Sequence, residues 1–197
     1  MAELRIARSE LILGGQKSGK TARAEALAGA WMAVSPDRHA VYIATAQAWD
    51  EEMGERISRH QRERATRVPG MRTVEETTQL AHAISAHSDP DTLVVVDCLT
   101  LWLTGLLMPA AVPDPAKTVR QAASADAHEA VIAQMLGACA GPLVLVSNEI
   151  GLGVIPMGRD VRAFVDALGQ LNQRTAAACE RVTLMAAGLP LTLKEAP

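Results

Sequence analysis

Aromatic residues and positive charge are both scarce in this chain of 197 residues. Phe, Trp and Tyr together make up 3% of it, and the formal net charge is −3 with an isoelectric point near 6.0. Proteins that bind nucleic acids usually present a basic face or stack bases on aromatic rings. The composition therefore argues against nucleic acid as a partner.

Cysteine is also scarce, and its spacing excludes the common cysteine-based sites. The three cysteines, Cys98, Cys139 and Cys179, form no C-x-x-C pair. An odd number argues against a disulfide framework, and the spacing argues against a zinc knuckle. We interpret them as core thiols or as thiols without a chemical role, which suits a reducing compartment.

Long apolar runs are missing as well. No stretch approaches the roughly 18 apolar residues of a membrane-spanning helix, and residues 1–5 lack the apolar core of a signal peptide. We therefore expect a cytoplasmic protein without a membrane span. Hydrophobic residues still make up 49% of the chain, so a single domain over residues 1–197 with a sizeable core is expected.

Short apolar runs rich in β-branched residues recur along the chain and predict strands. They lie at residues 10–13, 40–44, 92–96, 142–146 and 181–185. Near-continuous hydrophobicity is typical of strands covered on both faces, as in a parallel sheet. Segments with helical character lie between them, at residues 21–33, 50–64, 77–87, 118–138 and 158–180. This alternation predicts a doubly wound, mostly parallel α/β sheet that binds ligands at the carboxyl ends of its strands.

Two further segments complete the predicted topology. A helix that begins at Cys98 should be broken by the proline-rich segment 108–115, which we expect to be a surface loop. Residues 189–193 are expected to add a short antiparallel edge strand after a turn at Gly188.

One segment carries the clearest functional signal, because it fits G-x-x-x-x-G-K-[ST] directly after the apolar run 11–13. It comprises Gly14, Gly15, Gln16, Lys17, Ser18, Gly19, Lys20 and Thr21. A glycine-rich turn between a strand and a helix directs successive backbone N–H groups at one point, where the helix dipole adds positive potential. Lys20 is expected to reach the β- and γ-phosphates of a nucleotide, and the Thr21 hydroxyl to bind Mg²⁺. The alternative is a chance match in a flexible turn.

Asp97 directly follows the apolar run 93–96, as expected of the acidic partner of a phosphate-binding loop. A carboxylate at this position would hold Mg²⁺ opposite Thr21, either directly or through water. The alternative is an acid at the end of a strand that only caps the next helix. The loop upstream favours the metal role.

His60 is a second candidate, in a predicted helix that also carries Arg56, Arg59, Arg62 and Arg64. Arg56, His60 and Arg64 share one helix face at a spacing of four. The arginines could bind a triphosphate, and their charge disfavours imidazolium, which leaves a neutral ring able to attack phosphorus. Glutamates alternate with the arginines, so a solvated helix face explains the same pattern, and spacing alone favours that interpretation.

Polar residues also follow the predicted strand 142–146. Ser147, Asn148 and Glu149 lead into the glycine-bearing loop 150–156. Such residues at the carboxyl end of a strand suit a ligand-facing position, but ordinary turn chemistry accounts for them equally well. Residues 172–174, late in the last long helix, are expected on a ligand or subunit contact, or on a plain exposed face.

Taken in order, these segments resemble the bifunctional adenosylcobinamide kinase/adenosylcobinamide-phosphate guanylyltransferases of cobalamin biosynthesis. The resemblance covers residues 11 to about 193. The segments that carry it are Gly14–Thr21, Tyr42–Ala46, Asp50–Met53, Arg56-Ile57 with Arg59-His60, Thr73–Glu76, Asp97–Thr100 and Ser147–Pro156. The phosphate-binding loop alone is generic, whereas this combination of segments is specific to the family.

The resemblance implies a RecA-like P-loop fold that assembles as a homotrimer. It also implies an enzyme that phosphorylates adenosylcobinamide with ATP or GTP, with Mg²⁺ as cofactor. A histidine then receives GMP from GTP and passes it to adenosylcobinamide phosphate. His60 matches the position of that histidine, which reverses the preference that spacing alone gave. Arg59 and Glu75 lie in matching segments and are implied to contact the nucleotide together with Asp97.

Several positions depart from the family pattern. Gln16 and Lys17 stand where Ala-Arg is frequent, Met71 where tryptophan is frequent, and Asp97 where glutamate can occur. Lys17 keeps the charge of arginine but not its forked donor geometry. The changes at Met71 and Asp97 remove no charge, so the departures bear on nucleotide preference rather than on reaction class. The Asn-Lys-x-Asp motif that reads guanine is absent, and the sequence therefore assigns no residue to the base.

Two other functions stay open from the sequence. One is a P-loop kinase of small molecules that forms no covalent intermediate. The other is a RecA-like, nucleotide-dependent interaction module that uses the apolar helix around Trp102 as its docking surface.

Overall fold

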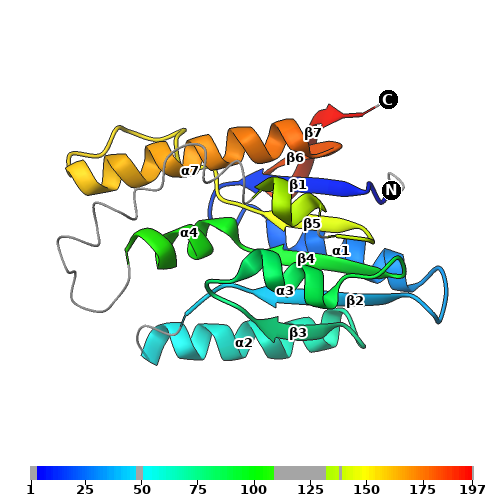
Figure 1. The fold of residues 1–197 in the computed structure, drawn as a ribbon. Helices are drawn as coiled ribbons and strands as arrows, with labels where there is room; N and C mark the ends of the chain where they lie inside the picture. The colour runs from blue at the N-terminus through cyan, green and yellow to red at the C-terminus, as the bar shows by residue number, and fades with distance from the viewer. Residues whose placement is uncertain (1–3, 48–50, 109–131, 138, 197) are drawn as a thin grey trace.

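A seven-stranded sheet forms the centre of the computed structural model, which describes residues 4–47, 51–108, 132–137 and 139–196 (Figure 1). The strand order is β3-β2-β4-β5-β1-β6-β7, and every neighbouring pair is parallel except β6 and β7. The strands are β1 (Ser9–Gly14), β2 (His39–Ala44), β3 (Arg72–Glu75), β4 (Thr92–Asp97), β5 (Leu143–Val146), β6 (Arg181–Ala186) and β7 (Leu189–Glu195).

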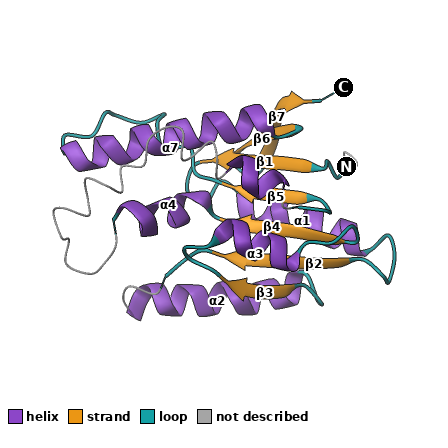
Figure 2. Ribbon diagram, in the orientation of Figure 1, coloured by secondary structure: helices purple, strands orange, loops and turns teal. Residues whose placement is uncertain are grey.

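Helices alternate with the strands and lie along both faces of the sheet (Figure 2). They are α1 (Lys20–Met32), α2 (Glu51–Arg67), α3 (Leu80–His87), α4 (Leu99–Leu107) and α7 (Arg159–Ala178). Residues 132–137 are also helical. Among the described residues, none of the helices combines the length and apolarity that crossing a bilayer requires.

The core consists of two apolar layers, one on each face of the sheet. Successive side chains of β4 alternate between them: Leu93 and Val95 join one layer, and Val94 and Val96 join the other. Helix α1 packs against the first layer, whereas α3, α4 and α7 pack against the second. Because both faces are covered, the strands are apolar at almost every position, and the prediction of a mostly parallel α/β sheet is confirmed.

The five predicted strands and the antiparallel edge strand are all present. Strands β6 and β7 are joined by Ala187 and Gly188, whose φ angles of 51° and 80° fit a two-residue hairpin turn. Strand β3 was not predicted, because its four residues include only one apolar side chain and form the other edge of the sheet. Of the predicted helix 118–138, residues 132–137 are helical, and the rest lies outside the described residues, as does most of the proline-rich segment.

All three cysteines are buried, as the sequence suggested, and burial raises the pKa of each thiol. The pKa reaches about 12 for Cys98 and about 11 for Cys179. Because the thiolate is the reactive form, we expect the folded protein at about pH 8 to react with a thiol reagent at least roughly tenfold more slowly than the unfolded chain. Counting thiols with Ellman's reagent, with and without guanidinium chloride, checks this. Rapid native modification of any cysteine would contradict it.

Candidate active site

The phosphate-binding loop connects β1 to α1 at the carboxyl edge of the sheet. Its backbone takes positive φ angles at Gly14 (152°), Lys17 (56°) and Gly19 (103°). A Cβ atom at Gly14 would lie 2.5 Å from both the Met185 carbonyl oxygen and Ser18 Oγ. A side chain at position 14 would therefore displace the loop, which explains why glycine stands there.

Lys20 begins α1 and folds back over the loop. Its Nζ donates a hydrogen bond of 2.7 Å to the Gly15 carbonyl oxygen, and the residue is buried. Burial lowers the pKa of this ammonium group, and the Asp97 carboxylate opposes that shift. A buried cation that is hydrogen-bonded to a neutral carbonyl is well placed to exchange that partner for an anion.

Asp97 ends β4 and accepts two short hydrogen bonds on the same oxygen. Thr21 Oγ1 donates to Asp97 Oδ2 at 2.6 Å, and the Tyr42 hydroxyl donates to it at 2.7 Å. Thr21 belongs to the loop, and Tyr42 belongs to β2, which lies beside β4. Asp97 is thus a junction between the loop and the neighbouring strand, so its contacts are not those of a simple helix cap.

Tyr42 is buried between this carboxylate and an arginine. The guanidinium carbon of Arg64 lies 3.4 Å from the centre of the Tyr42 ring. Arg64 Nη1 also donates to Thr73 Oγ1 at 3.0 Å, and Nε lies 3.7 Å from Glu25 Oε1. These contacts attach the second half of α2 to strands β2 and β3 and to α1, and sequence reasoning gave no sign of them.

The pKa of Tyr42 is raised well above its ordinary value of 10.0, mainly by burial and then by the charge of Asp97. Tyr42 is the single tyrosine of the chain, so tyrosinate absorbance reports this residue alone. We expect the native protein to keep the phenol protonated at pH 10.0, where an exposed tyrosine is half ionised. Since the unfolded chain releases this proton at a lower pH, stability should fall as pH rises through 10.0. Tyrosinate formation in the folded protein at that pH would contradict this.

A pocket of about 310 Å³ lies between the loop and α2. The predicted site residues that line it are Gln16, Lys17, Lys20, Thr21, His60 and Asp97, and Arg64 and Asn148, for which the sequence left a ligand contact open, line it as well. The fold therefore brings the imidazole of α2 and the phosphate-binding loop to one cavity. The His60 side chain is 43% exposed, and its Nδ1 lies 3.7 Å from Glu63 Oε2. Its roles in binding and catalysis stay predictions.

Arg59 and Glu75 lie outside this lining, as do Gly14, Gly15, Ser18 and Gly19 of the loop. Arg59 lines a separate surface hollow together with Ser58 and Arg62. Glu75 accepts a hydrogen bond of 2.9 Å from Gln61 Nε2, and Gln61 lines the pocket, so Glu75 is one residue removed from the cavity. Neither placement tests a contact with a nucleotide, and both roles stay predictions.

The residues after β5 lie beside the same loop. The backbone N–H of Glu149 donates to the Gly14 carbonyl oxygen at 3.1 Å. Asn148 lines the pocket described above, whereas Glu149 lines a larger neighbouring pocket. Thr100 Oγ1 accepts a hydrogen bond of 2.8 Å from the Asn148 backbone and so fixes this turn.

Comparison with known proteins identifies the family to which this architecture belongs. The family described as cobinamide kinase / cobinamide phosphate guanyltransferase matches residues 10–193. The chain is 45% identical over 189 residues to the bifunctional adenosylcobalamin biosynthesis protein CobP of Pseudomonas aeruginosa, which covers 95% of this chain and 98% of that protein. It is 37% identical over 188 residues to the bifunctional adenosylcobalamin biosynthesis protein CobU of Escherichia coli, covering 93% and 98%.

A third relative is the bifunctional adenosylcobalamin biosynthesis protein CobU of Salmonella typhimurium, which is 35% identical over 187 residues and covers 93% of this chain and 98% of its own. These matches extend over the loop, β2, α2, β4 and the turn after β5, which together enclose the pocket. They confirm the resemblance that the ordered motifs indicated. The chain therefore belongs to the cobinamide kinase / cobinamide phosphate guanyltransferase family.

Proposed function

We propose that this protein carries out two successive transfers in the cytoplasm. It phosphorylates the aminopropanol hydroxyl of adenosylcobinamide with ATP or GTP, and it then transfers GMP from GTP to that phosphate, giving adenosylcobinamide-GDP. A guanylylated His60 carries the GMP. The observation that carries this proposal is the single pocket that His60 shares with Lys20, Thr21 and Asp97. Family membership supports both activities.

In the first transfer, the backbone N–H groups of the loop would hold the triphosphate. Lys20 Nζ would leave the Gly15 carbonyl oxygen, to which it now donates a hydrogen bond, and would donate to the β- and γ-phosphates instead. The residue is buried beside the loop where these phosphates would bind. The hydroxyl oxygen of the acceptor then attacks the γ-phosphorus. The bond between that phosphorus and the βγ-bridging oxygen breaks, the nucleoside diphosphate leaves, and the hydroxyl proton passes to solvent. Catalysis here is mostly positioning and charge neutralisation.

We include Mg²⁺ in this proposal, because the residues around Asp97 are suited to bind it. Thr21 Oγ1 and Asp97 Oδ2 lie 2.6 Å apart at the wall of the pocket, and both are hard oxygen ligands. Mg²⁺ typically takes one or two protein oxygens and completes its octahedron with water and phosphate oxygens. When bound, it supplies positive charge to the transferring phosphates. The bond from Tyr42 would keep the carboxylate oriented toward the loop.

In the second transfer, Nε2 of neutral His60 attacks the α-phosphorus of GTP. The bond between the α-phosphorus and the αβ-bridging oxygen breaks, and pyrophosphate leaves. This step requires a proton on Nδ1, which lies 3.7 Å from Glu63 Oε2, and a lone pair on Nε2. A phosphate oxygen of the cobinamide phosphate then attacks the same phosphorus, and the nitrogen–phosphorus bond breaks to regenerate neutral imidazole. Two easier displacements replace one.

Incubation of the protein with GTP labelled either at the α- or at the γ-phosphorus tests the proposal. We expect protein-bound label from α-labelled GTP alone, labile in acid and stable in base, in the peptide that contains His60. Addition of adenosylcobinamide phosphate should discharge the label as adenosylcobinamide-GDP. A P-loop kinase without a covalent intermediate would give phosphate transfer and no protein-bound label. Label on a residue other than His60 would also refute the assignment.

We further propose that the chain is a single domain that assembles as a homotrimer. All seven residues of edge strand β7 are exposed, including Leu189 (71%), Leu191 (57%) and Leu193 (55%). An exposed apolar edge strand is a surface that natural proteins usually cover. Sedimentation equilibrium should give a mass of about three times 20.9 kDa, and a monomer would contradict the assembly.

A further inference from the structure

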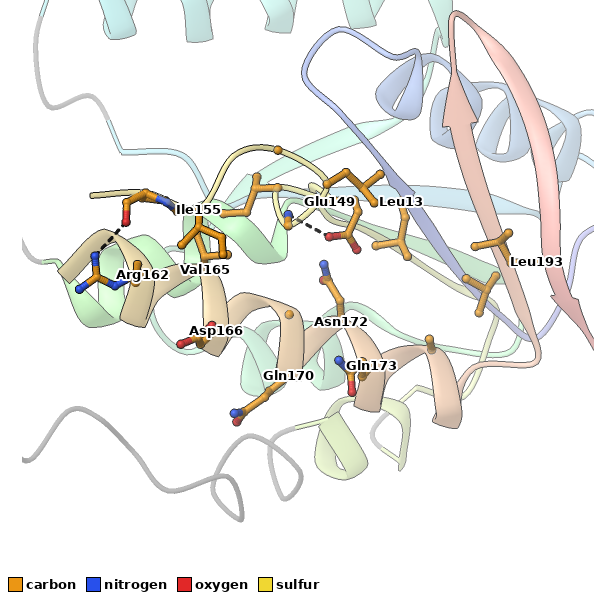
Figure 3. A pocket seen from close by; sticks show the side chains of 18 of the residues that line it. Leu13, Glu149, Ile155, Arg162, Val165, Asp166, Gln170, Asn172, Gln173 and Leu193 are labelled. Carbon is orange, nitrogen blue, oxygen red and sulfur yellow. Dashed lines mark hydrogen bonds between the residues drawn. The ribbon is translucent and has the colours of Figure 1, made fainter. Parts of the chain in front are cut away.

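A second pocket, with a volume of about 910 Å³, lies on the other side of the turn that follows β5. It is enclosed by loop 149–156, by one face of α7 and by residues of β1, β6 and β7. Figure 3 shows Asn172 of α7 directed toward Glu149 and Leu13, with Val165 beside Ile155 at the outer end. Nothing in the two transfers described above uses this cavity.

The larger pocket and the pocket of the phosphate-binding loop share a wall. Asn172 lines the larger pocket, and its Nδ2 donates a hydrogen bond of 3.0 Å to the carbonyl oxygen of Asn148, which lines the smaller one. The backbone of Glu149, the next residue, bonds to Gly14 of the loop. A molecule in the larger pocket is thus separated from the loop by a single turn of chain.

The lining combines an apolar surface with amide and carboxylate groups. Apolar side chains come from several elements of the sheet and from α7, whereas Gln170, Gln173, Glu149 and Asp166 supply polar groups. Asn172 is 3% exposed, and its Oδ1 has no hydrogen-bond partner among the described residues. Buried acceptors without partners are uncommon, and a bound molecule is one common reason for them.

The two cations at this pocket already have internal partners. Arg162 Nη1 donates to the carbonyl oxygens of Pro156 and Met157 and so attaches loop 149–156 to α7 (Figure 3). Lys194 Nζ donates to three carbonyl oxygens at the end of α7. Both cations keep their charge, so together with the carboxylates of Glu149 and Asp166 the lining is formally neutral, and its amide and carboxylate groups suit a ligand that bears amides.

We propose that this pocket holds the corrin macrocycle of the acceptor, an inference that rests on the proposed function. A corrinoid is a large methylated ring with peripheral primary amides and a cationic cobalt centre. Its ring matches the apolar lining, and its amides match the glutamines and carboxylates. The volume lies near the upper end for ligand pockets, as a macrocycle requires. The aminopropanol arm would then extend past Asn148 to the loop.

Gly169 offers a direct test, because it lines the pocket from the middle of α7. Among the described residues, no atom lies within 4 Å of a Cβ atom placed there, so Gly169→Ala adds a methyl group without a clash and serves as the control. Gly169→Trp should project an indole ring into the pocket and obstruct part of it. Gln173→Trp, one turn further along at an exposed position, is a second blocking variant should the first fail to fold.

Binding of adenosylcobinamide is measured by isothermal titration calorimetry, which needs neither chemical step, alongside labelling of the protein by α-labelled GTP. We expect both tryptophan variants to weaken corrinoid binding by at least about tenfold, whereas Gly169→Ala should bind the corrinoid as the parent protein does. Labelling by α-labelled GTP should change by less than about twofold in all three variants. Unchanged corrinoid binding in both tryptophan variants would overturn the inference even if labelling is intact. A changed oligomeric mass with unchanged corrinoid binding would also overturn it and assign the pocket to a contact between copies. Loss of labelling in the parent protein would instead count against the proposed function.

Discussion

Replacement of His60 by alanine is expected to remove protein-bound GMP and to lower guanylyl transfer by about 10⁴-fold or more, because the imidazole would be the group that accepts GMP from GTP. Phosphorylation of adenosylcobinamide should stay within about fivefold, since that step uses the loop and not the ring. The side chain is 43% exposed and its charged contact is a surface glutamate, so the stability should change by less than about 0.5 kcal/mol. Labelling with α-labelled GTP and a separate kinase assay give the two rates.

The matched control for this variant is His82→Ala, which removes an exposed histidine on α3. It should leave both rates unchanged. Added imidazole should restore part of the transfer in His60→Ala, because the pocket left by the side chain opens on the loop that would hold GTP. Retention of acid-labile GMP on the His60→Ala protein would show that another residue carries it.

Replacement of Lys20 by alanine is expected to slow both transfers by roughly 10²- to 10³-fold, the range seen when one donor to a transition-state oxyanion is removed. Both transfers develop charge on phosphate oxygens, and Lys20 is the buried cation that begins the helix behind the loop. This variant thus differs from His60→Ala, which should spare the first transfer. Initial rates of corrinoid phosphorylation and of GMP labelling, measured on the same preparation, distinguish the two.

Stability provides an internal control for the Lys20 variant. Burial lowers the pKa of Lys20, so at neutral pH the folded state holds a charge that its surroundings disfavour. Removal of the ammonium group should therefore leave the melting temperature unchanged or slightly higher. Lys20→Arg keeps a charge but not the compact ammonium, and its activity should fall as well. Transfer rates within about tenfold of the parent in Lys20→Ala would refute a role in phosphate binding.

Much of the fold could be predicted because each strand depends on local composition. The apolar runs of β1, β2, β4, β5 and β6 can be recognised in the sequence, since strands that are covered on both faces need apolar side chains at nearly every position. Strand β3 escaped prediction because it is short and lies at an edge, where Arg72 and Glu75 remain exposed. Its signal would have been the β-branched pair Thr73 and Val74.

The candidate site also has parts that the sequence predicted and parts that it did not. The phosphate-binding loop and the acid at the end of β4 follow from neighbouring residues, because a tight turn and a strand end leave local patterns. Tyr42 was missed as a partner of Asp97, since the two are 55 positions apart and only the pairing of β2 with β4 brings them together. The burial of Arg64 was missed for the same reason, because its partners lie on β2, β3 and α1.

The sequence by itself therefore determined the sheet class, the loop and its acid, and, through the order of its motifs, the family. The spacing of charges along α2 left open whether His60 lies on a solvated helix face or beside the loop, and only the family resemblance favoured the second arrangement. The tertiary structure places the ring, which is 43% exposed, in the lining of the pocket beside the loop. Arg64 packs on the Tyr42 ring and toward Glu25, which fixes the rotation of α2, and the face that Arg64 shares with His60 consequently lines the pocket while Arg59 lies elsewhere. Long-range packing sets the rotation of a helix about its axis. Periodicity shows which residues share a helix face, but it carries no information about which neighbouring element that face will contact.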